Sequence, residues 1–254
     1  MTEIQHEKAP SFTSGFHCLG HLVLYRFSGD ITAFIVRSIP AGLFDLRLFH
    51  VQLDRSLVQF LTPTHSHTLR YVCLSECTQV EEDHVVHLIL STLHGLGFFD
   101  VSGDPVIFDP EVLQQTPWVC RNLQELYFIP KCDGSSRYSP LEAQQALMTQ
   151  IGALTNLRKL YFGRLYSADY KNIMETGFAP EASWTLLSSL TKLKEVDLGF
   201  LPEVPLTARD ARMMIRYWPH LKELYSVYPK GNEAFVDYMK ENRPKLQLED
   251  GPRY

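Results

Sequence analysis

L-Q-E-L-Y-F at residues 123–128 and L-R-K-L-Y-F at residues 157–162 repeat one spacing of apolar residues. Residues 193–198, L-K-E-V-D-L, and 221–226, L-K-E-L-Y-S, keep the same skeleton, L-x-x-L-x-L. Side chains alternate between the two faces of a strand, so positions 4 and 6 of this skeleton share a face with the core. Each segment is therefore predicted to be one short strand with a buried side.

Weaker copies of the skeleton begin at Leu19, Leu43, Leu69 and Leu93, and a clipped copy is P-K-L-Q-L at residues 244–248. The first leucines are separated by 24, 26, 24, 30, 34, 36, 28 and 25 residues. S-G-D occurs at residues 28–30 and 102–104, at one offset from Leu19 and from Leu93, and this agreement places the fourth unit at Leu93. Repetition at this period predicts a solenoid.

Helical periodicity between the strands predicts helices over residues 81–90, 141–154 and 208–217. The segments 132–140 and 166–182, rich in Gly, Ser, Pro and Asp, are predicted to be loops. A unit of one strand and one helix cannot cover its own apolar face, so the units must stack. We predict an α/β fold: a curved leucine-rich-repeat solenoid with a parallel sheet on the concave face and helices on the convex face. Residues 1–18 would form a tail, and residues 19–254 a single solenoid of eight to nine irregular repeats whose first strand has an exposed edge.

Composition narrows the classes of function. The 24 Lys and Arg against 29 Asp and Glu give a net charge of -5, whereas a general nucleic-acid binder is usually basic, so we expect no nucleic-acid partner. No apolar run reaches the length of a membrane span and no secretory signal is recognisable, so no membrane partner is expected. Five scattered cysteines do not form a disulfide framework. These features predict an intracellular protein of the cytoplasm or the nucleus.

A family likeness is carried by W-V-C-R-N-L-Q-E-L-Y at 118–127, I-G-A-L-T-N-L-R-K-L-Y at 151–161, R-Y-W-P-H-L-K-E-L at 216–224 and E-N-R-P-K-L at 241–246. These stretches resemble the repeat region of fungal F-box/leucine-rich-repeat proteins. In that family the F-box module binds the Skp1 adaptor of a cullin ubiquitin ligase, and the repeats select the protein to be ubiquitinated. No F-box is recognisable before Leu19, so the chain is interpreted as a repeat-only relative or an incomplete gene product.

Positions 1, 4 and 6 of the skeleton are predicted to point into the core, so positions 3, 5 and 7 should emerge on the concave face. Position 3 is predicted to hold His21, Asp45, Tyr71, Gly95, Glu125, Lys159, Glu195 and Glu223, and position 5 to hold Val23, Arg47, Cys73, Gly97, Tyr127, Tyr161, Asp197 and Tyr225. Adjacent strands lie about 4.8 Å apart, which puts Tyr127 beside Tyr161, and Lys159 between Glu125 and Glu195.

Exposed tyrosines beside charges suit protein recognition. The predicted partner-binding residues are Tyr71, Tyr127, Tyr161, Tyr225, Lys159 and Asp197. The alternative is that the Glu and Lys side chains only form a ladder that stabilises the sheet.

Several histidines, cysteines and basic residues that could bind a metal or an anion are interpreted as structural or solvated. His65, His67, Cys73 and Cys77 match no standard zinc spacing, and His84, His87 and His94 are interpreted as solvated or capping histidines, so no metal or cofactor is expected. The basic residues at position 2, Arg70, Arg158, Lys194 and Lys222, are interpreted as a solvated edge.

No catalytic motif occurs, so the chain is not expected to be an enzyme. The leading hypothesis is a noncatalytic recognition module that selects substrates for an F-box-type ligase. The alternatives are a free-standing scaffold, and an enzyme whose site is assembled from distant loops.

Overall fold

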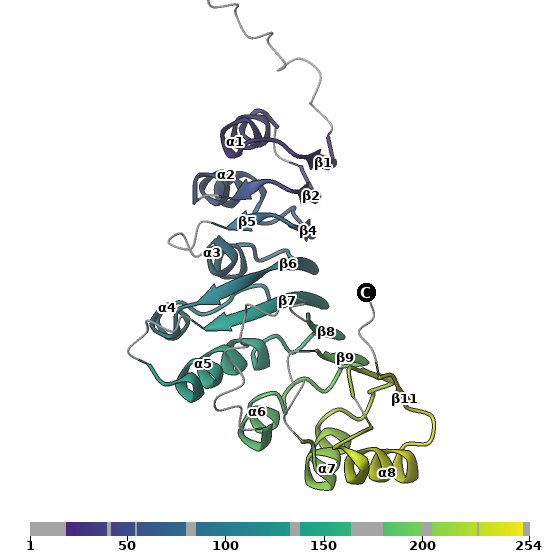
Figure 1. Cartoon of the computed structure of the whole chain (residues 1–254). Helices are drawn as coiled ribbons and strands as arrows, with labels where there is room; N and C mark the ends of the chain where they lie inside the picture. Colours follow the sequence, from purple (N-terminus) through teal and green to yellow (C-terminus); the bar gives the residue numbers. More distant parts are fainter. Residues whose placement is uncertain are drawn as a thin grey trace, which may run out of the picture.

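The computed structural model describes residues 19–39, 42–53, 55–79, 85–132, 138–163, 180–199, 205–227 and 229–250. In this part of the chain, strands and helices alternate along the sequence and form two layers of a curved stack, with the strands on one side and the helices on the other (Figure 1). All sheet pairings are parallel. The chain is therefore an α/β solenoid of the leucine-rich-repeat type, as predicted.

The main sheet runs in the order β1 (His21–Tyr25), β2 (Asp45–Phe49), β4 (Tyr71–Cys73), β6 (Phe98–Phe108), β7 (Glu125–Cys132), β8 (Lys159–Phe162), β9 (Glu195–Leu198), β10 (Glu223–Tyr225) and β11 (Gln247–Leu248). Two short strands, β3 (Gln52–Leu53) and β5 (Thr78–Gln79), pair beside it. The helices are α1 (Gly29–Ser38), α2 (Arg55–His65), α3 (Val85–Thr92), α4 (Pro110–Gln115), α5 (Pro140–Gly152), α6 (Pro180–Leu186), α7 (Ala208–Tyr217) and α8 (Glu233–Asn242).

Two of the predicted helices are confirmed closely. The helix predicted over residues 208–217 is α7, and the one predicted over residues 141–154 is α5. A capping box starts α5: the Ser139 hydroxyl accepts from the Glu142 backbone N–H, and the Glu142 carboxylate accepts from the Ser139 backbone N–H. Residues 81–84 of the helix predicted over residues 81–90 lie outside the described residues. The described part of this helix, α3, begins at Val85 and continues two residues beyond the predicted end, to Thr92.

The predicted loop over residues 166–182 is wrong at its end. The helix α6 begins at Pro180, which has the fixed φ suited to a first helical turn. The rest of that segment, residues 166–179, lies outside the described residues, as do residues 133–137 of the other predicted loop. In that other loop Cys132 still belongs to β7, and Pro140 already belongs to α5.

The core follows the predicted skeleton. In β7 and the residues before it, Leu123, Leu126 and Phe128 are at most 1% exposed, and the corresponding residues of the next unit, Leu157, Leu160 and Phe162, are equally buried. Burial of each such side chain contributes roughly 1.5–3 kcal/mol. Positions 4 and 6 therefore face the helices, as the alternation requires, and position 1 is buried in the turn that precedes the strand.

The predicted register of the fourth unit is wrong by three residues. Phe98 pairs with Tyr71 on one side and with Glu125 on the other, so this unit is L-G-F-F-D-V at residues 96–101, beginning at Leu96. Leu69, Leu96 and Leu123 are then evenly spaced by 27 residues. The error arose because Leu93 and Leu96 are both fully buried and both fit the loose skeleton.

This correction removes Gly95 and Gly97 from the concave face and puts Phe98 and Asp100 there. The second S-G-D, at residues 102–104, which the sequence suggested as the turn that ends a strand, lies inside β6, where the pairing shifts between Val101 and Pro105. In the last unit Gln247 pairs with Glu223 and Leu248 with Leu224, so the register differs by one residue from a repeat that begins at Leu246; Leu246 and Leu248 are both half-buried against the core.

Side chains in the turns tie neighbouring units together. The Thr68 hydroxyl donates to the carbonyl of Leu43 at 2.9 Å, and the Asn156 amide donates to the carbonyl of Arg121 at 2.9 Å. Both donors stand directly before the first leucine of a unit, and each reaches one unit back. These bonds satisfy turn carbonyls that the sheet leaves without partners.

Two buried side chains in the described stretches, Thr32 and His65, have no hydrogen-bond partner for any of their polar atoms. His65, at the end of α2, is 1% exposed, and neither ring nitrogen has a hydrogen-bond partner among the described residues. Burial lowers the pKa of His65 below its usual value. The folded chain therefore takes up a proton at this site less readily than the unfolded chain does.

We expect His65→Leu to raise the free energy of unfolding at pH 7 by about 1 kcal/mol, because it removes an unsatisfied polar group from the core. As the pH falls below the unfolded value of about 6.5, the unfolded wild-type chain gains a proton that the folded one resists, so folding stability falls. Urea unfolding at pH 7.5 and pH 5.5 checks both points. The variant should lose less stability than wild type between these pH values, and equal losses would contradict this role of His65.

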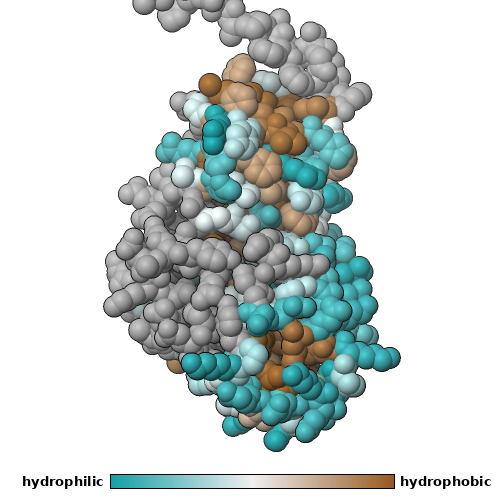
Figure 2. Space-filling model, turned by 45° about the vertical axis from the view of Figure 1, so that its right-hand side comes forward, coloured by the Kyte–Doolittle hydropathy of each residue, from teal (hydrophilic) through white to brown (hydrophobic). Residues whose placement is uncertain are grey.

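The two ends of the sheet differ. Among the described residues, most exposed large apolar side chains lie around β1 and α1: Val23, Tyr25, Phe27, Ile31, Phe34 and Phe44. Figure 2 shows hydrophobic surface at this end of the molecule. The other end closes with a two-residue edge strand, β11, which offers little edge for pairing. None of the helices in the described stretches has the length and apolarity needed to cross a bilayer.

Candidate protein-binding surface on the concave face

The strand pairings set out two rows of side chains on the concave face. Position 3 runs His21, Asp45, Tyr71, Phe98, Glu125, Lys159, Glu195, Glu223 and Gln247. Position 5 runs Val23, Arg47, Cys73, Asp100, Tyr127, Tyr161, Asp197 and Tyr225. All six predicted binding residues lie in these rows.

Aromatic rings form a continuous row across the sheet. Tyr71 stacks on Phe98 with ring centroids 3.9 Å apart and planes 6° from parallel, and Phe98 lies 5.3 Å from Tyr127. Tyr127 stacks on Tyr161 at 4.5 Å and 4°, which confirms the prediction that they lie side by side. Tyr161 is 6.1 Å from Tyr225. We call these five residues the aromatic row.

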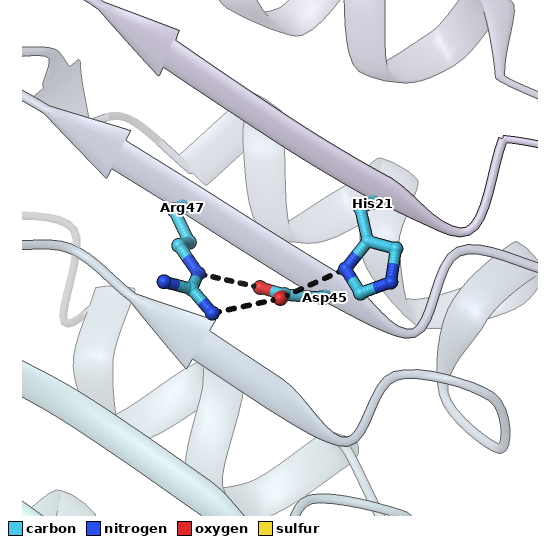
Figure 3. A network of polar contacts seen from close by, with 3 residues as sticks. All are labelled: His21, Asp45 and Arg47. Atoms are coloured by element: carbon cyan, nitrogen blue, oxygen red, sulfur yellow. Dashed lines mark hydrogen bonds and ion pairs between the residues drawn. The ribbon is translucent and has the colours of Figure 1, made fainter.

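A polar network at the end of the aromatic row fixes the position of Arg47. Its Nε and Nη2 each donate to one carboxylate oxygen of Asp45 at 3.0 Å, and His21 Nδ1 lies 3.0 Å from Asp45 Oδ2 (Figure 3). Arg47 Cζ lies 4.4 Å from the ring centroid of Tyr71. The guanidinium is thus held on one side by a bidentate carboxylate and on the other by an aromatic ring.

The same network determines the charge of Asp45, which is nearly buried. Burial alone raises the pKa of its carboxyl, but the hydrogen bonds and charges of Arg47 and His21 outweigh burial and hold the pKa below its usual value. The Asp45 carboxylate in turn raises the pKa of Arg47. Asp45 is therefore ionised at neutral pH and keeps Arg47 in place.

The predicted Glu and Lys ladder is present. Lys159 Nζ lies 3.5 Å from Glu125 Oε1 and 3.7 Å from Glu195 Oε2, as the strand order requires. The Tyr127 hydroxyl donates to Glu125 at 2.9 Å, and the Tyr161 hydroxyl donates to Glu195. These contacts support the interpretation of Lys159, Glu125 and Glu195 as a ladder that stabilises the sheet.

Exposure divides the aromatic row into two parts. Tyr161 is 1% exposed, Asp197 1% and Tyr225 8%, so the expectation that these three emerge on an open surface is wrong. Asp197 Oδ1 accepts hydrogen bonds from the Gly199 N–H and the Ser226 hydroxyl, which close the turn after β9. Their proposed binding role remains a prediction, but the buried fraction favours a structural one.

The accessible aromatic and cationic side chains that lie outside the Glu and Lys ladder are over β1 to β7, whereas over β8 to β10 the accessible side chains of the two rows are Lys159, Glu195 and Glu223. We call the part of the concave face over β1 to β7 the open face and define it by five side chains that are all exposed or half-buried: Val23, Arg47, Tyr71, Phe98 and Tyr127. Phe98 was missed because the fourth unit was placed at Leu93. Only the even spacing of 27 residues around Leu96 could have revealed it in the sequence.

The thiols and histidines on or near this face do not form a reactive group. Burial, and then the charge of Asp100, raise the pKa of Cys73 to about 12. Cys77 donates to the Leu48 carbonyl at 3.3 Å. His87, predicted to be solvated or capping, is buried and accepts from Trp118 Nε1 at 3.2 Å, whereas His84 lies outside the described residues. No three His, Cys, Asp or Glu side chains in the described stretches gather into a group that could hold a metal ion.

Comparisons with known proteins add little to this description. No protein-family model matches the chain, and no curated protein does. Among solved structures, the chain is similar to the yeast Rad7 and Elc1 complex, at 14% identity over 91% of this chain and 67% of that chain, with a TM-score of 0.41. It is also similar to the mouse RP105/MD-1 complex, at 17% identity over 92% of this chain, with a TM-score of 0.40. The match covers 47% of that chain, so this chain spans about half of its length. These TM-scores are too low to carry an argument, so the fold class rests on the parallel pairings described above.

Proposed function

We propose that the chain is a noncatalytic recognition module that binds a protein partner on its open face. The observation that carries this proposal is the stack of Arg47, Tyr71 and Phe98, in which a cation and two rings lie one against the next. Tyrosine and arginine are the side chains that most often dominate protein interfaces.

The geometry lowers the entropic cost of binding. Arg47 is already held by Asp45, and Tyr71 is already held between Arg47 and Phe98, so few rotamers remain to be fixed when a partner docks. These rings keep part of their surface accessible, which leaves apolar area for a partner to bury. A preorganised aromatic and cationic surface on a parallel sheet suits a folded or extended protein segment.

The double variant Arg47→Ala/Tyr71→Ser should lose at least about tenfold in affinity for the partner, because each such anchor typically contributes more than 1 kcal/mol. The partner is first identified by cross-linked capture and mass spectrometry with the wild-type chain. Its affinity for each purified variant is then measured by titration calorimetry.

The convex face offers a matched control. Arg212 Cζ lies 5.2 Å from the Tyr238 ring, an equivalent pair on α7 and α8. Arg212→Ala/Tyr238→Ser removes the same chemistry from the opposite layer and should leave the affinity within twofold. If both folded variants bind the partner as tightly as wild type, the open face is not the binding surface.

The finer proposal is that this module selects substrates for an F-box-type ubiquitin ligase, and it is supported by the sequence resemblance alone. It predicts that Skp1 and cullin co-purify with the chain, directly or through a separate F-box subunit. The alternative is a free-standing scaffold with protein partners but no ligase. Quantitative capture separates them, because partner binding without Skp1 and cullin supports the scaffold and contradicts the ligase role.

A further inference from the structure

One edge of the solenoid carries charge of a single sign. This strand-entry edge comprises the turns and position 2 residues that lead into β4 and the later strands of the main sheet: residues 66–70, 93–97, 119–124, 153–158, 188–194, 217–222 and 242–246. These ranges contain no Asp or Glu. Their charged residues are all Lys or Arg: Arg70, Arg121, Arg158, Lys192, Lys194, Lys222, Arg243 and Lys245. The whole chain has a net charge of -5, so this separation is not a consequence of composition.

The acidic residues that neighbour this edge in sequence do not neutralise it. Glu125, Glu195 and Glu223 each come one residue later, at position 3, and belong to the concave face. There they are engaged by Lys159 or by tyrosine hydroxyls. The alternation of the strands turns Glu125 and Glu195 to the concave face, whereas Glu223 also lines the groove that contains Lys222.

Some of the cations have a structural explanation. The helices end at this edge, and cations near a helix C-terminus offset its macrodipole. Arg121 donates to the Ala153 carbonyl, and Arg243 donates to the Pro219 carbonyl at 2.8 Å. Lys192 donates to Asn156 Oδ1 at 2.6 Å. These three are accounted for by turn geometry.

The other five cations of the strand-entry edge are not explained by turn geometry. Within the described part of the chain, no side-chain hydrogen bond or ion pair engages Arg70, Arg158, Lys194, Lys222 or Lys245. Like charges on neighbouring strands repel one another, so this row is retained at some cost in stability.

Two grooves lie between these cations. The first, of about 400 Å³, has Arg70 and Arg158 at its sides and the amides of Asn122, Gln124 and Asn156 in its lining. At its wall the Arg70 guanidinium packs directly on Gly95, where a Cβ would come within 1.8 Å of Nη1. The second groove, of about 570 Å³, is lined by Lys222, Arg243 and Lys245, and also by Glu223, the one acidic residue in either lining.

We propose that the strand-entry edge binds an acidic, extended polypeptide segment. Carboxylates of the segment would pair with the five unengaged cations, and the groove amides would hydrogen-bond its backbone. Arg158, Lys194 and Lys222 all occupy position 2, so strands about 4.8 Å apart space them along an approximately linear track, which suits an extended chain.

Nucleic acid fits this edge less well than an acidic peptide. Single-stranded nucleic-acid sites combine a basic groove with aromatic side chains on which bases stack. The two grooves are lined by charged, amide, glycine, proline and leucine residues, with one imidazole, His220, and no Phe, Tyr or Trp. This surface is separate from the open face, so its failure would leave the recognition role intact.

The test measures binding of a fluorescein-labelled twelve-residue peptide of alternating Glu and Ser to the full chain by anisotropy at low salt. A Gln and Ser peptide and a labelled dT12 oligonucleotide are the comparison probes. We compare wild type with Arg158→Glu/Lys222→Glu and with Arg212→Glu/Lys230→Glu, which changes net charge equally but lies on the helix layer and in the turn before α8.

We expect the acidic peptide to bind wild type, the edge variant to lose at least tenfold in affinity, and the control variant to remain within threefold. Circular dichroism confirms that each variant is folded. No binding of the acidic peptide by wild type, or equal losses in the two variants, would overturn the proposal. Tighter binding of the oligonucleotide than of the peptide would overturn the assignment to an acidic polypeptide.

Discussion

Phe99→Ala should lower the free energy of unfolding by about 3–5 kcal/mol, the usual cost of removing a fully buried aromatic side chain. Phe99 is 0% exposed at position 4 of the corrected fourth unit. Its loss leaves a cavity between the sheet and the helices, and a packed core closes such a cavity only in part. Urea unfolding followed by circular dichroism measures the change.

The neighbouring residue gives the control. Phe98 faces the open surface and touches Tyr71 and Tyr127, so Phe98→Ala should cost only about 0.5–1.5 kcal/mol, the range for an aromatic pair. The register that begins at Leu93 reverses the two positions, with Phe98 in the core and Phe99 outside. A larger loss from Phe98→Ala than from Phe99→Ala would therefore restore that register and remove Phe98 from the candidate site.

Trp184→Ala should have an effect of similar size, about 3–5 kcal/mol. The indole is 1% exposed, packs edge-to-face against Trp218 with centroids 5.8 Å apart, and donates from Nε1 to Asp210 Oδ1 at 3.0 Å. It joins α6 to α7, so its removal weakens the contact between two successive units, on which a solenoid depends. Thermal unfolding of the purified variants checks the prediction.

Trp184→Phe separates packing from hydrogen bonding. It keeps most of the apolar volume but leaves Asp210 Oδ1 without the indole donor, and we expect a loss of about 1–3 kcal/mol. Asp210 keeps its bonds to the Thr207 backbone N–H and hydroxyl, which limits the damage. If Trp184→Ala unfolds at the wild-type temperature, the contact of Trp184 with α7 does not stabilise the packing of α6 on α7.

The parallel arrangement could be predicted from the sequence because the skeleton states which side chains are buried. Leu126 and Phe128 are two residues apart, as side chains on one face of a strand must be, and the same pair recurs in unit after unit, so the units can only stack side by side. Tyr127 beside Tyr161, and Lys159 between two glutamates, follow from that register and are confirmed.

The register of a single unit was harder to predict. A one-dimensional pattern cannot separate Leu93 from Leu96 when both are buried, and neighbouring strands decide between them by pairing. Burial of Tyr161, Asp197 and Tyr225 is likewise a tertiary property, because side-chain alternation specifies a face of the sheet and not its exposure. The network of His21, Asp45 and Arg47 joins two strands and could be inferred only once their register was known.

The strand-entry edge illustrates the same point. The sequence shows cations at position 2, but a glutamate directly follows two of them, Lys194 and Lys222. A charge summed along the sequence is therefore zero for each such pair. The strands place Lys194 and Glu195 on different surfaces, so their charges do not cancel on the strand-entry edge, whereas Glu223 shares the second groove with Lys222. Charge patterning in a repeat protein has to be counted by surface.

The most direct test of the recognition role is site-specific photo-cross-linking. Benzoylphenylalanine replaces Phe98 on the open face in one variant and Tyr238 on the convex face in another, and each is irradiated with the partner identified by capture. We predict a covalent adduct from position 98 and none from position 238. An adduct from position 238 alone, or from neither position with the complex intact, would contradict binding on the concave sheet.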